Sequence, residues 1–302
     1  MGKRIFTRGN LIRMYFSLSG AVAIIFLILI FAFLLKEGYP AIKEIGFFEF
    51  FSGYRWMPSS KDPGFGTLAL ILSTLIVATG AVVISVPWGV ITAGYISEIA
   101  PPRIKEIMKI TVEILAIFPS VVLGFIGLTI LAPFIARFFH LSNGLTALTG
   151  ALMLSIMALP TIISISEDAI NSVPREYKEA SYALGATRWE TLRTVTLPGA
   201  SSGIVAAVML GFGRAIGETM TVLMVTGNSL AVPLQELWGI PVPDFLTSVR
   251  TLTATIAIEA SDVPWGSLHY HSLFVVGAIL FGLTFVVNLL ADIFLNRSQR
   301  RD

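Results

Sequence analysis

Two ionisable side chains, Arg214 and Glu218, lie inside a long apolar stretch. Residues 202–226 contain no other Asp, Glu, Lys or Arg. An arginine at the centre of a bilayer costs about 2.5–3.5 kcal/mol on insertion scales, and such residues usually serve a function. In a helix Glu218 lies one turn after Arg214, so the spacing predicts that the two can pair. Either they form a buried ion pair that pins helices together, or Arg214 faces a water-filled path and meets an anion.

Arginine suits a tetrahedral oxyanion because its planar guanidinium can donate two parallel hydrogen bonds. In the second interpretation, Glu218 holds Arg214 while the path is empty and gives way when the anion arrives. This exchange weakens net binding, which a conduit requires because it must release what it binds. Arg250 is a second candidate for the anion entrance. Glycines around the pair predict close helix packing: Gly203, Gly211, Gly213 and Gly217, the last two in GxxxG spacing.

The polar stretch 168–200 has the pattern of a short helix, a glycine bend and a second helix. Pro174 suits the first turn of a helix, and Gly185 suits a left-handed helix end. Thr187 and Glu190 have the spacing of a capping box. The first helix, of roughly 11 residues, is too short to be stable alone. It is therefore expected to dock, either on the membrane helices of its own chain or on a separate cytoplasmic protein.

The elements that position these residues are expected to be membrane-spanning helices. The chain of 302 residues is 55% hydrophobic and 13% charged, whereas soluble domains average about 25% charged. Proline is expected to kink three spans, at Pro87, Pro119 and Pro160. Six stretches are long enough to cross a bilayer: 14–36, 67–97, 108–132, 146–167, 202–226 and 272–295. The sequence thus predicts an all-α integral membrane protein with six transmembrane helices.

The Lys and Arg distribution predicts the orientation of these spans. With the N-terminus inside, fourteen of the 21 Lys and Arg residues lie in inside segments and six lie in outside segments. The positive-inside rule then places both termini in the cytoplasm. The outside segment 37–66 is rich in aromatic residues, which are expected to lie at the headgroup level. Within the second long outside segment, residues 252–260 are too short to span and form either a re-entrant or interfacial helix or an ordered loop.

The stretch 168–200 resembles the EAA loop of bacterial ABC importer permeases. The family pattern is E-A-A, three residues, G, nine residues, I-x-L-P, and this chain departs from it only at Ser181 and Val195. The resemblance implies a type I ABC importer permease fold with a coupling helix that binds a cytoplasmic ATPase. It assigns the following residues to that contact: Glu179, Ala180, Leu184, Gly185, Leu197 and Pro198.

Four further segments look like the C-type permeases of bacterial high-affinity phosphate importers: 95–102, 117–127, 211–228 and 248–259. That resemblance implies a phosphate path past Arg214 and Glu218 in a bacterial inner membrane. It also implies an A-type permease partner, two ATPase subunits and an external phosphate-binding protein. The five-helix core is expected at 67–295, between an N-terminal segment 1–66 and a tail 296–302. Without the resemblance, Arg214 does not distinguish phosphate from sulfate or molybdate.

Other function classes fit the sequence less well. The chain lacks the G-x-x-x-x-G-K-[ST] phosphate-binding sequence, so ATP hydrolysis is expected from partner subunits. It has no cysteine and no nucleophile–base or metal constellation within its spans. We therefore expect a transport subunit and not an enzyme, with no cofactor, metal or nucleic acid bound. A gradient-driven secondary transporter is the alternative, but such a protein needs no loop that docks an ATPase.

Overall fold

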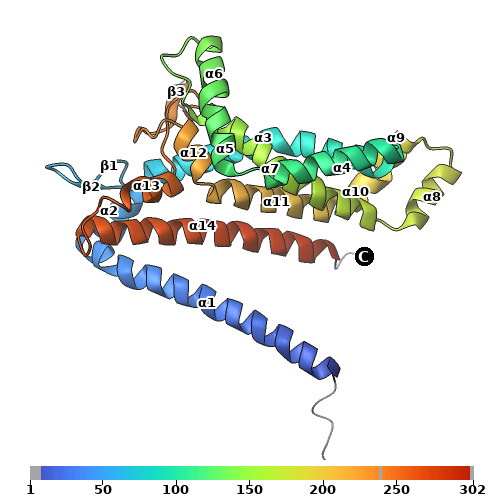
Figure 1. Ribbon diagram of the computed structural model, residues 1–302, viewed down its shortest axis with the longest axis horizontal. Coiled ribbons are helices and arrows are strands. Elements are labelled where there is room, and N and C mark those ends of the chain that lie inside the picture. The colour runs from blue at the N-terminus through green and yellow to red at the C-terminus, as the bar shows by residue number, and fades with distance from the viewer. Residues whose placement is uncertain (1–7, 238–239, 300–302) are drawn as a thin grey trace, which may run out of the picture.

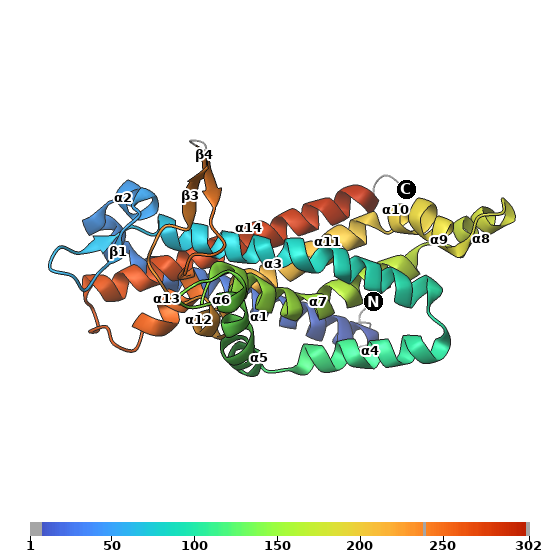
Figure 2. The same ribbon diagram turned by 90° about the horizontal axis from the view of Figure 1, so that it is seen from above.

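The computed structural model describes residues 8–237 and 240–299, which form an elongated helical bundle with two short strand pairs (Figures 1 and 2). Lys3, Arg4, Arg300 and Arg301, which contribute to the predicted charge asymmetry, lie outside the described residues. Within that part of the chain, five helices are long and apolar enough to cross a membrane, or six if one bent pair counts as a single span. The prediction of an all-helical membrane protein is confirmed.

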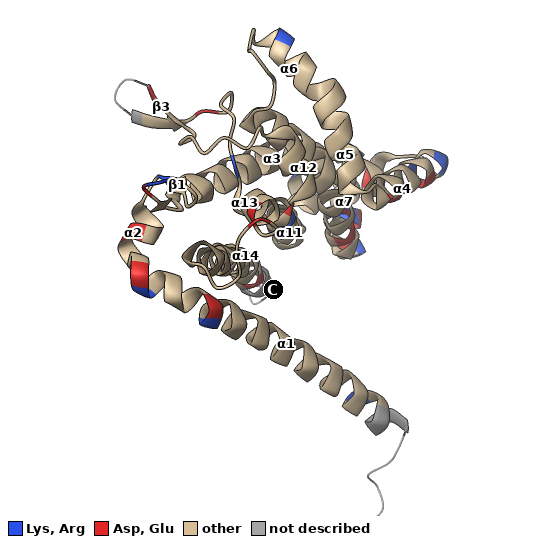
Figure 3. Ribbon diagram, turned by 60° about the vertical axis from the view of Figure 1, so that its left-hand side comes forward, with Lys and Arg blue, Asp and Glu red and all other residues tan. Residues whose placement is uncertain are grey.

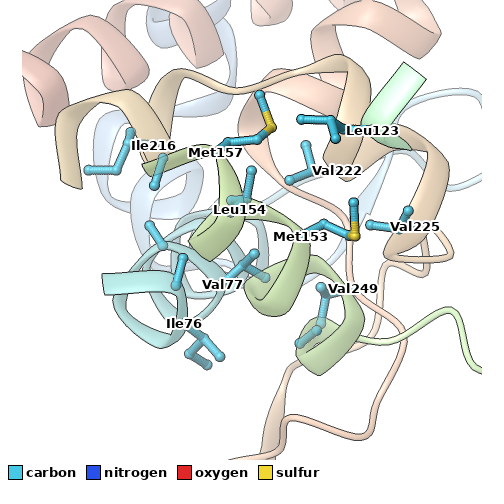
Figure 4. Packing of buried hydrophobic residues seen from close by; sticks show 14 of the residues in the cluster. Ile76, Val77, Leu123, Met153, Leu154, Met157, Ile216, Val222, Val225 and Val249 are labelled. Atoms are coloured by element: carbon cyan, nitrogen blue, oxygen red, sulfur yellow. The ribbon is translucent and has the colours of Figure 1, made fainter. Parts of the chain in front are cut away.

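The centre of the bundle consists of α3 (Leu68–Gly94), α7 (Ala147–Ser172) and α11 (Ser201–Gly217), which pack against one another. Pro87 and Pro160 lie within α3 and α7 without ending them. The buried cluster between these helices also receives side chains from α5 (Ser120–Ile126) and α12 (Met220–Val225) (Figure 4). Figure 4 labels its larger members: Ile76, Val77, Leu123, Met153, Leu154, Met157, Ile216, Val222, Val225 and Val249.

α1 (Arg8–Ile45) lies at the edge of the bundle and packs mainly along α14 (Leu268–Gln299) over its C-terminal half (Figure 1). Phe31 stacks on Phe281, and Phe33 makes an edge contact with Phe274. Charged residues lie near the ends of α1 and not along its middle (Figure 3). Such a helix suits a lipid environment on most of its surface.

The aromatic segment after α1 folds back onto the bundle. α2 (Phe47–Ser52) is followed by the antiparallel strands β1 (Trp56–Met57) and β2 (Gly64–Phe65). Phe50 and Trp56 are completely buried among residues of α13 (Leu252–Glu259) and α14, whereas Phe48 is 83% exposed. Phe50 and Trp56 therefore pack within the protein, and the expectation that this segment lies at the headgroup level stays a prediction.

The predicted third span, 108–132, is broken at Pro119. The π-helix η1 (Tyr95–Ile99) continues directly from α3, and α4 (Pro102–Ile117) follows it. α4 ends before Phe118, whose backbone is not helical. A residue before proline is biased away from helix, which explains this break. The chain then turns into α5 (Ser120–Ile126), the π-helix η2 (Gly127–Leu131) and α6 (Ala132–Phe138), and α6 projects from the bundle (Figure 1). The apolar span is Ser120–Phe138.

The segment between α12 (Met220–Val225) and α14 contains a hairpin and a short helix. Strands β3 (Leu234–Leu237) and β4 (Ile240–Pro243) pair antiparallel. The stretch predicted as a short helix or an ordered loop is α13 (Leu252–Glu259). Its first four residues are buried, and it packs against α3, α12 and α14. We refer below to this end of the bundle as the β1 end.

Candidate functional site

Arg214 projects from α11 onto an exposed face of the bundle. It lies about 20 Å along the helix from Ser201, given a rise of about 1.5 Å per residue. Its Nη1 donates a hydrogen bond to Thr161 Oγ1 of α7 at 3.2 Å. Within the described part of the chain, no carboxylate lies within 4.0 Å of its guanidinium. The guanidinium therefore keeps donors available beyond its hydrogen bond to Thr161, for which the described part of the chain supplies no carboxylate.

The predicted pairing of Glu218 with Arg214 is wrong. α11 ends at Gly217, and Glu218 is extended with ψ 133°, so the two residues do not share a helical face. Glu218 Oε1 instead accepts a hydrogen bond from the Thr221 N–H at 3.3 Å, and its carbonyl accepts one from Thr253 Oγ1 at 2.8 Å. Spacing of i and i+4 predicts contact only where the helix is continuous. The two residues nevertheless line one narrow gap between α7 and α11.

The glycines of α11 predict a close helix contact, and this contact lies at Gly203 and Gly211 and not at the GxxxG pair Gly213 and Gly217. A Cβ on Gly217 would meet nothing within 4 Å, and one on Gly213 would meet only Asn288 Oδ1 at 3.3 Å. A Cβ on Gly203 would lie 2.3 Å from the Ala169 Cβ of α7. One on Gly211 would lie 2.9 Å from Ile162 Cγ1, also on α7. Gly203 and Gly211, not the GxxxG pair, let α11 approach α7.

Arg250 belongs to a polar cluster at the β1 end, which we call the Glu259 cluster: Trp56, Arg250, Glu259 and His269. Arg250 Nη1 lies 2.8 Å from Glu259 Oε1, and Arg250 Nε donates to the Asn228 carbonyl at 3.1 Å. Trp56 Nε1 donates to Glu259 Oε2 at 3.0 Å, and His269 Nε2 lies 2.8 Å from the same oxygen. The Arg250 and Glu259 side chains are 16% and 15% exposed. Arg250 is therefore neutralised within its own chain.

The loop after α7 folds as the sequence predicts. α8 (Arg175–Ala183) begins directly after Pro174, and Gly185 has a φ of +88°. α9 (Arg188–Thr191) starts with the capping box of Thr187 and Glu190. The Thr187 N–H and hydroxyl both donate to the Glu190 carboxylate, and these hydrogen bonds lower the pKa of Glu190.

The chain then continues through the π-helix η3 (Leu192–Thr196) and α10 (Leu197–Gly199). It meets α11 at a bend of 71°. Val195 and Thr196 lie in the π-helical turn, and Pro198 lies in α10. The loop is thus joined to α11 by a series of helical turns that is interrupted at the bend.

α8 and the residues that follow it, up to α9, present apolar side chains that the described part of the chain leaves exposed. Leu184 is 91% exposed, and Tyr177 and Trp189 are 63% and 58% exposed. Glu179 and Ala180 are exposed as well. Of the remaining residues predicted to contact an ATPase, Gly185 and Pro198 are exposed and Leu197 is half-buried. Figure 2 shows α8 beyond the ends of the other helices, so these side chains are placed to meet another molecule.

The helical bundle, its apolar spans and this projecting loop define an integral-membrane permease of the type I ABC importer class. Residues 85–301 match the family described as "Binding-protein-dependent transport system inner membrane component", and the chain belongs to this family. Its members are transport subunits of the inner membrane that do not themselves hydrolyse ATP, and ABC importer permeases pair with ATPase subunits and binding proteins.

Curated relatives cover most of the chain. One is the "Probable ABC transporter permease protein YqgH" of Bacillus subtilis, which is 39% identical over 80% of this chain and 75% of that protein. Another is the "Phosphate transport system permease protein PstC" of Mesorhizobium japonicum, 35% identical over 89% of this chain and 84% of that protein. The resemblance to ABC importer permeases of the C type is thereby confirmed.

Solved structures support the fold. A bacterial alginate ABC transporter matches with a TM-score of 0.62 at 14% identity, over 96% of both chains. The MetNI methionine ABC transporter matches with a TM-score of 0.55 at 19% identity, over 77% of this chain and 94% of that chain. At these identities the likeness concerns the fold alone.

Proposed function

We propose that this chain is a permease subunit of an ATP-driven importer that carries inorganic phosphate across the cytoplasmic membrane. The observation that carries this proposal is Arg214, a cation on the apolar bundle whose described partner is a single threonine hydroxyl. Its guanidinium suits a tetrahedral oxyanion because it can donate two parallel hydrogen bonds. The relatives named phosphate permeases support phosphate over other oxyanions.

The exposure of Arg214 also supports a second permease chain. If this face of α11 met lipid, the arginine would carry an insertion cost of about 2.5–3.5 kcal/mol with little compensation. A homologous A-type permease opposite α11 would instead enclose a polar path between the two chains. Glu218 lies close to Arg214 in the chain, at the break between α11 and α12, and we assign it to the same path. Arg250 is a candidate for its entrance only when Glu259 releases it.

The other partners follow from the exposed loop. Of the two ATPase subunits in the cytoplasm, one binds this chain at α8 through Glu179, Ala180 and Leu184, and ATP is used by these subunits. A phosphate-binding protein delivers the anion at the β1 end. Both termini then lie in the cytoplasm, as the Lys and Arg asymmetry favours. The bacterial inner membrane is the site of this assembly.

Phosphate uptake by the reconstituted complex tests the proposal. Proteoliposomes holding both permeases, the ATPase subunits and the binding protein should accumulate radiolabelled phosphate only with ATP. Arg214→Gln should lower uptake about tenfold or more, because it removes charge-assisted hydrogen bonds worth about 1.5–3 kcal/mol. Arg103→Gln, at an exposed position of α4, is the matched control and should leave uptake unchanged.

Three results would contradict the proposal. Uptake without any ATPase subunit would indicate a gradient-driven carrier. Uptake of sulfate or molybdate in preference to phosphate would assign another oxyanion. Normal uptake by Arg214→Gln and by Glu218→Gln would exclude this part of α11 from the anion path.

A further inference from the structure

We propose that the ion pair between Lys178 of α8 and Glu98 of η1 is the link through which the coupling helix displaces α3. This inference rests on the proposed function, because it needs an ATPase that pulls on α8. It concerns two residues outside the exposed contact surface of the loop and outside the anion path. Both are positioning residues, since they transmit force and touch no transported anion.

The pair is short and largely shielded from solvent. Lys178 Nζ lies 2.5 Å from Glu98 Oε1, and the two side chains are 14% and 12% exposed. Lys178 Nζ also donates to the Ile170 carbonyl of α7 at 3.3 Å. Exposed ion pairs contribute little to stability, whereas charges that are shielded from water interact more strongly and are costly to separate. Lys178 therefore holds α8 against the ends of two membrane helices.

α8 has few other attachments to the bundle. Ser181 and Thr191 share a hydrogen bond of 2.9 Å, but Thr191 belongs to α9 in the same loop. No residue of α8 is buried. Among the described residues, Lys178 is the only α8 side chain with a hydrogen bond or ion pair to an element outside the loop. A pull on α8 reaches the bundle directly through Lys178, and otherwise along the chain or through α9 and η3, on which α8 packs.

Glu98 is well placed to receive that pull. It lies in η1, and α3 with η1 forms one helical segment from Leu68 to Ile99. Ala93 and Ile96, on either side of the start of η1, are fully buried, so this helix end is fixed in the core. α3 packs along α7 and also contacts α11, which carries Arg214. A displacement of Glu98 is thus passed to the helices that line the proposed anion path.

A second ion pair at the same end of the bundle provides a matched control. Lys109 Nζ lies 2.7 Å from Glu167 Oε1, and the Glu167 side chain is 7% exposed. This pair joins α4 to α7 and makes no contact with α8. Glu167 is at least as buried as Glu98, whereas Lys109 is 44% exposed and Lys105 Nζ also lies 3.8 Å from Glu167 Oε1. Removal of Lys109 therefore takes an ion pair away from the same end of the bundle without touching α8. Only the Lys178–Glu98 pair should affect how ATP hydrolysis is coupled to transport.

The first test measures phosphate moved per ATP hydrolysed in the reconstituted complex. Glu98→Gln and Lys178→Gln should each lower this ratio about fivefold or more while ATPase subunits remain bound, as expected for the loss of about 1 kcal/mol or more of coupling. The swapped variant Glu98→Lys/Lys178→Glu should recover most of the ratio. Lys109→Gln should leave the ratio at the wild-type value even if the complex becomes less stable.

The second test restores the link covalently. The chain contains no cysteine, so Glu98→Cys/Lys178→Cys introduces its only two thiols. A Lys–Glu pair spans more than the Cβ separation of about 3.5–4.5 Å that a disulfide needs. A reducible bifunctional thiosulfonate linker is therefore used, in a complex whose other subunits lack reactive cysteines. Cross-linking should raise the low ratio of this variant toward wild type, and reduction should lower it again.

The outcomes separate this inference from the proposed function. Single variants that keep the wild-type ratio, or a cross-link that abolishes transport, would overturn the link, because α8 and η1 would then have to move independently. An equal loss in Lys109→Gln would make the effect a general one of stability and would also overturn it. A wild-type complex that binds no ATPase subunit or moves no phosphate would instead contradict the proposed function.

Discussion

Replacement of Glu259 by alanine should destabilise the β1 end more than any exposed substitution nearby. Its carboxylate neutralises Arg250 and accepts the Trp56 N–H, and His269 lies against it. Removal of one partner of a buried ion pair costs about 3–5 kcal/mol, because the other charge stays buried without compensation. The side chains of this pair are 16% and 15% exposed. Because water can reach them in part, we expect the lower end of that range, about 3 kcal/mol.

The more conservative Glu259→Gln should cost less, about 1–2 kcal/mol. The amide retains one acceptor oxygen, so one donor of the cluster can still be satisfied. The charge is lost, however, and hydrogen bonds to charged groups contribute about 1.5–3 kcal/mol against about 1 kcal/mol for neutral ones. The order of stability should therefore be wild type, glutamine, then alanine.

Thermal or denaturant unfolding of the purified permease, followed by tryptophan fluorescence, measures these differences. Asp62→Asn is the control, because the Arg55–Asp62 pair is at the same end but is 55% and 90% exposed. Such a surface pair contributes little, and its loss should not be measurable. A double-mutant cycle with Trp56→Phe should give a coupling energy of about 0.5 kcal/mol or more for the Trp56–Glu259 contact. If Glu259→Ala were as stable as Asp62→Asn, the cluster would not hold this end together.

Three further outcomes are expected. Gly203→Ala should destabilise the protein by about 1–3 kcal/mol, because the new methyl overlaps α7, whereas Gly217→Ala should be tolerated. Leu184→Glu should weaken binding of the ATPase subunits in a pull-down without lowering the melting temperature, because this side chain is 91% exposed. Since hydrogen bonds from Thr187 lower the pKa of Glu190 from its usual 4.5, their contribution is complete above that pH and fades as the pH falls through the lowered pKa. The stability difference between wild type and Thr187→Ala should therefore narrow below pH 4.5.

Local sequence patterns predicted the features that depend on neighbouring residues. The spans follow from hydropathy, because lipid selects for continuous apolar helices. The loop after α7 follows from Gly185 and from the capping box of Thr187 and Glu190, each of which acts within a few residues. Arg214 was identifiable because a charge in an apolar stretch is rare whatever the fold.

Contacts between distant segments could not be predicted in the same way. Trp56 and Glu259 are 203 residues apart, and nothing local to either one indicates their hydrogen bond. The burial of Phe50 likewise depends on how the segment after α1 folds back. The pairing of Arg214 with Glu218 failed for a related reason. It assumed that one apolar stretch is one helix, whereas α11 ends at Gly217.

The break after Gly217 changes how Arg214 and Glu218 can act together. Arg214 belongs to α11, which is joined through the bend of 71° to the loop that carries α8. Glu218 is tied to α12 and α13 by its hydrogen bonds with Thr221 and Thr253. A displacement of α11 by an ATPase would therefore alter the separation of the two charges, which a continuous helix would hold fixed. In the proposed importer, this separation regulates how strongly Arg214 holds an anion. The Glu218 carboxylate, when it approaches, competes with the anion for the N–H donors of the Arg214 guanidinium.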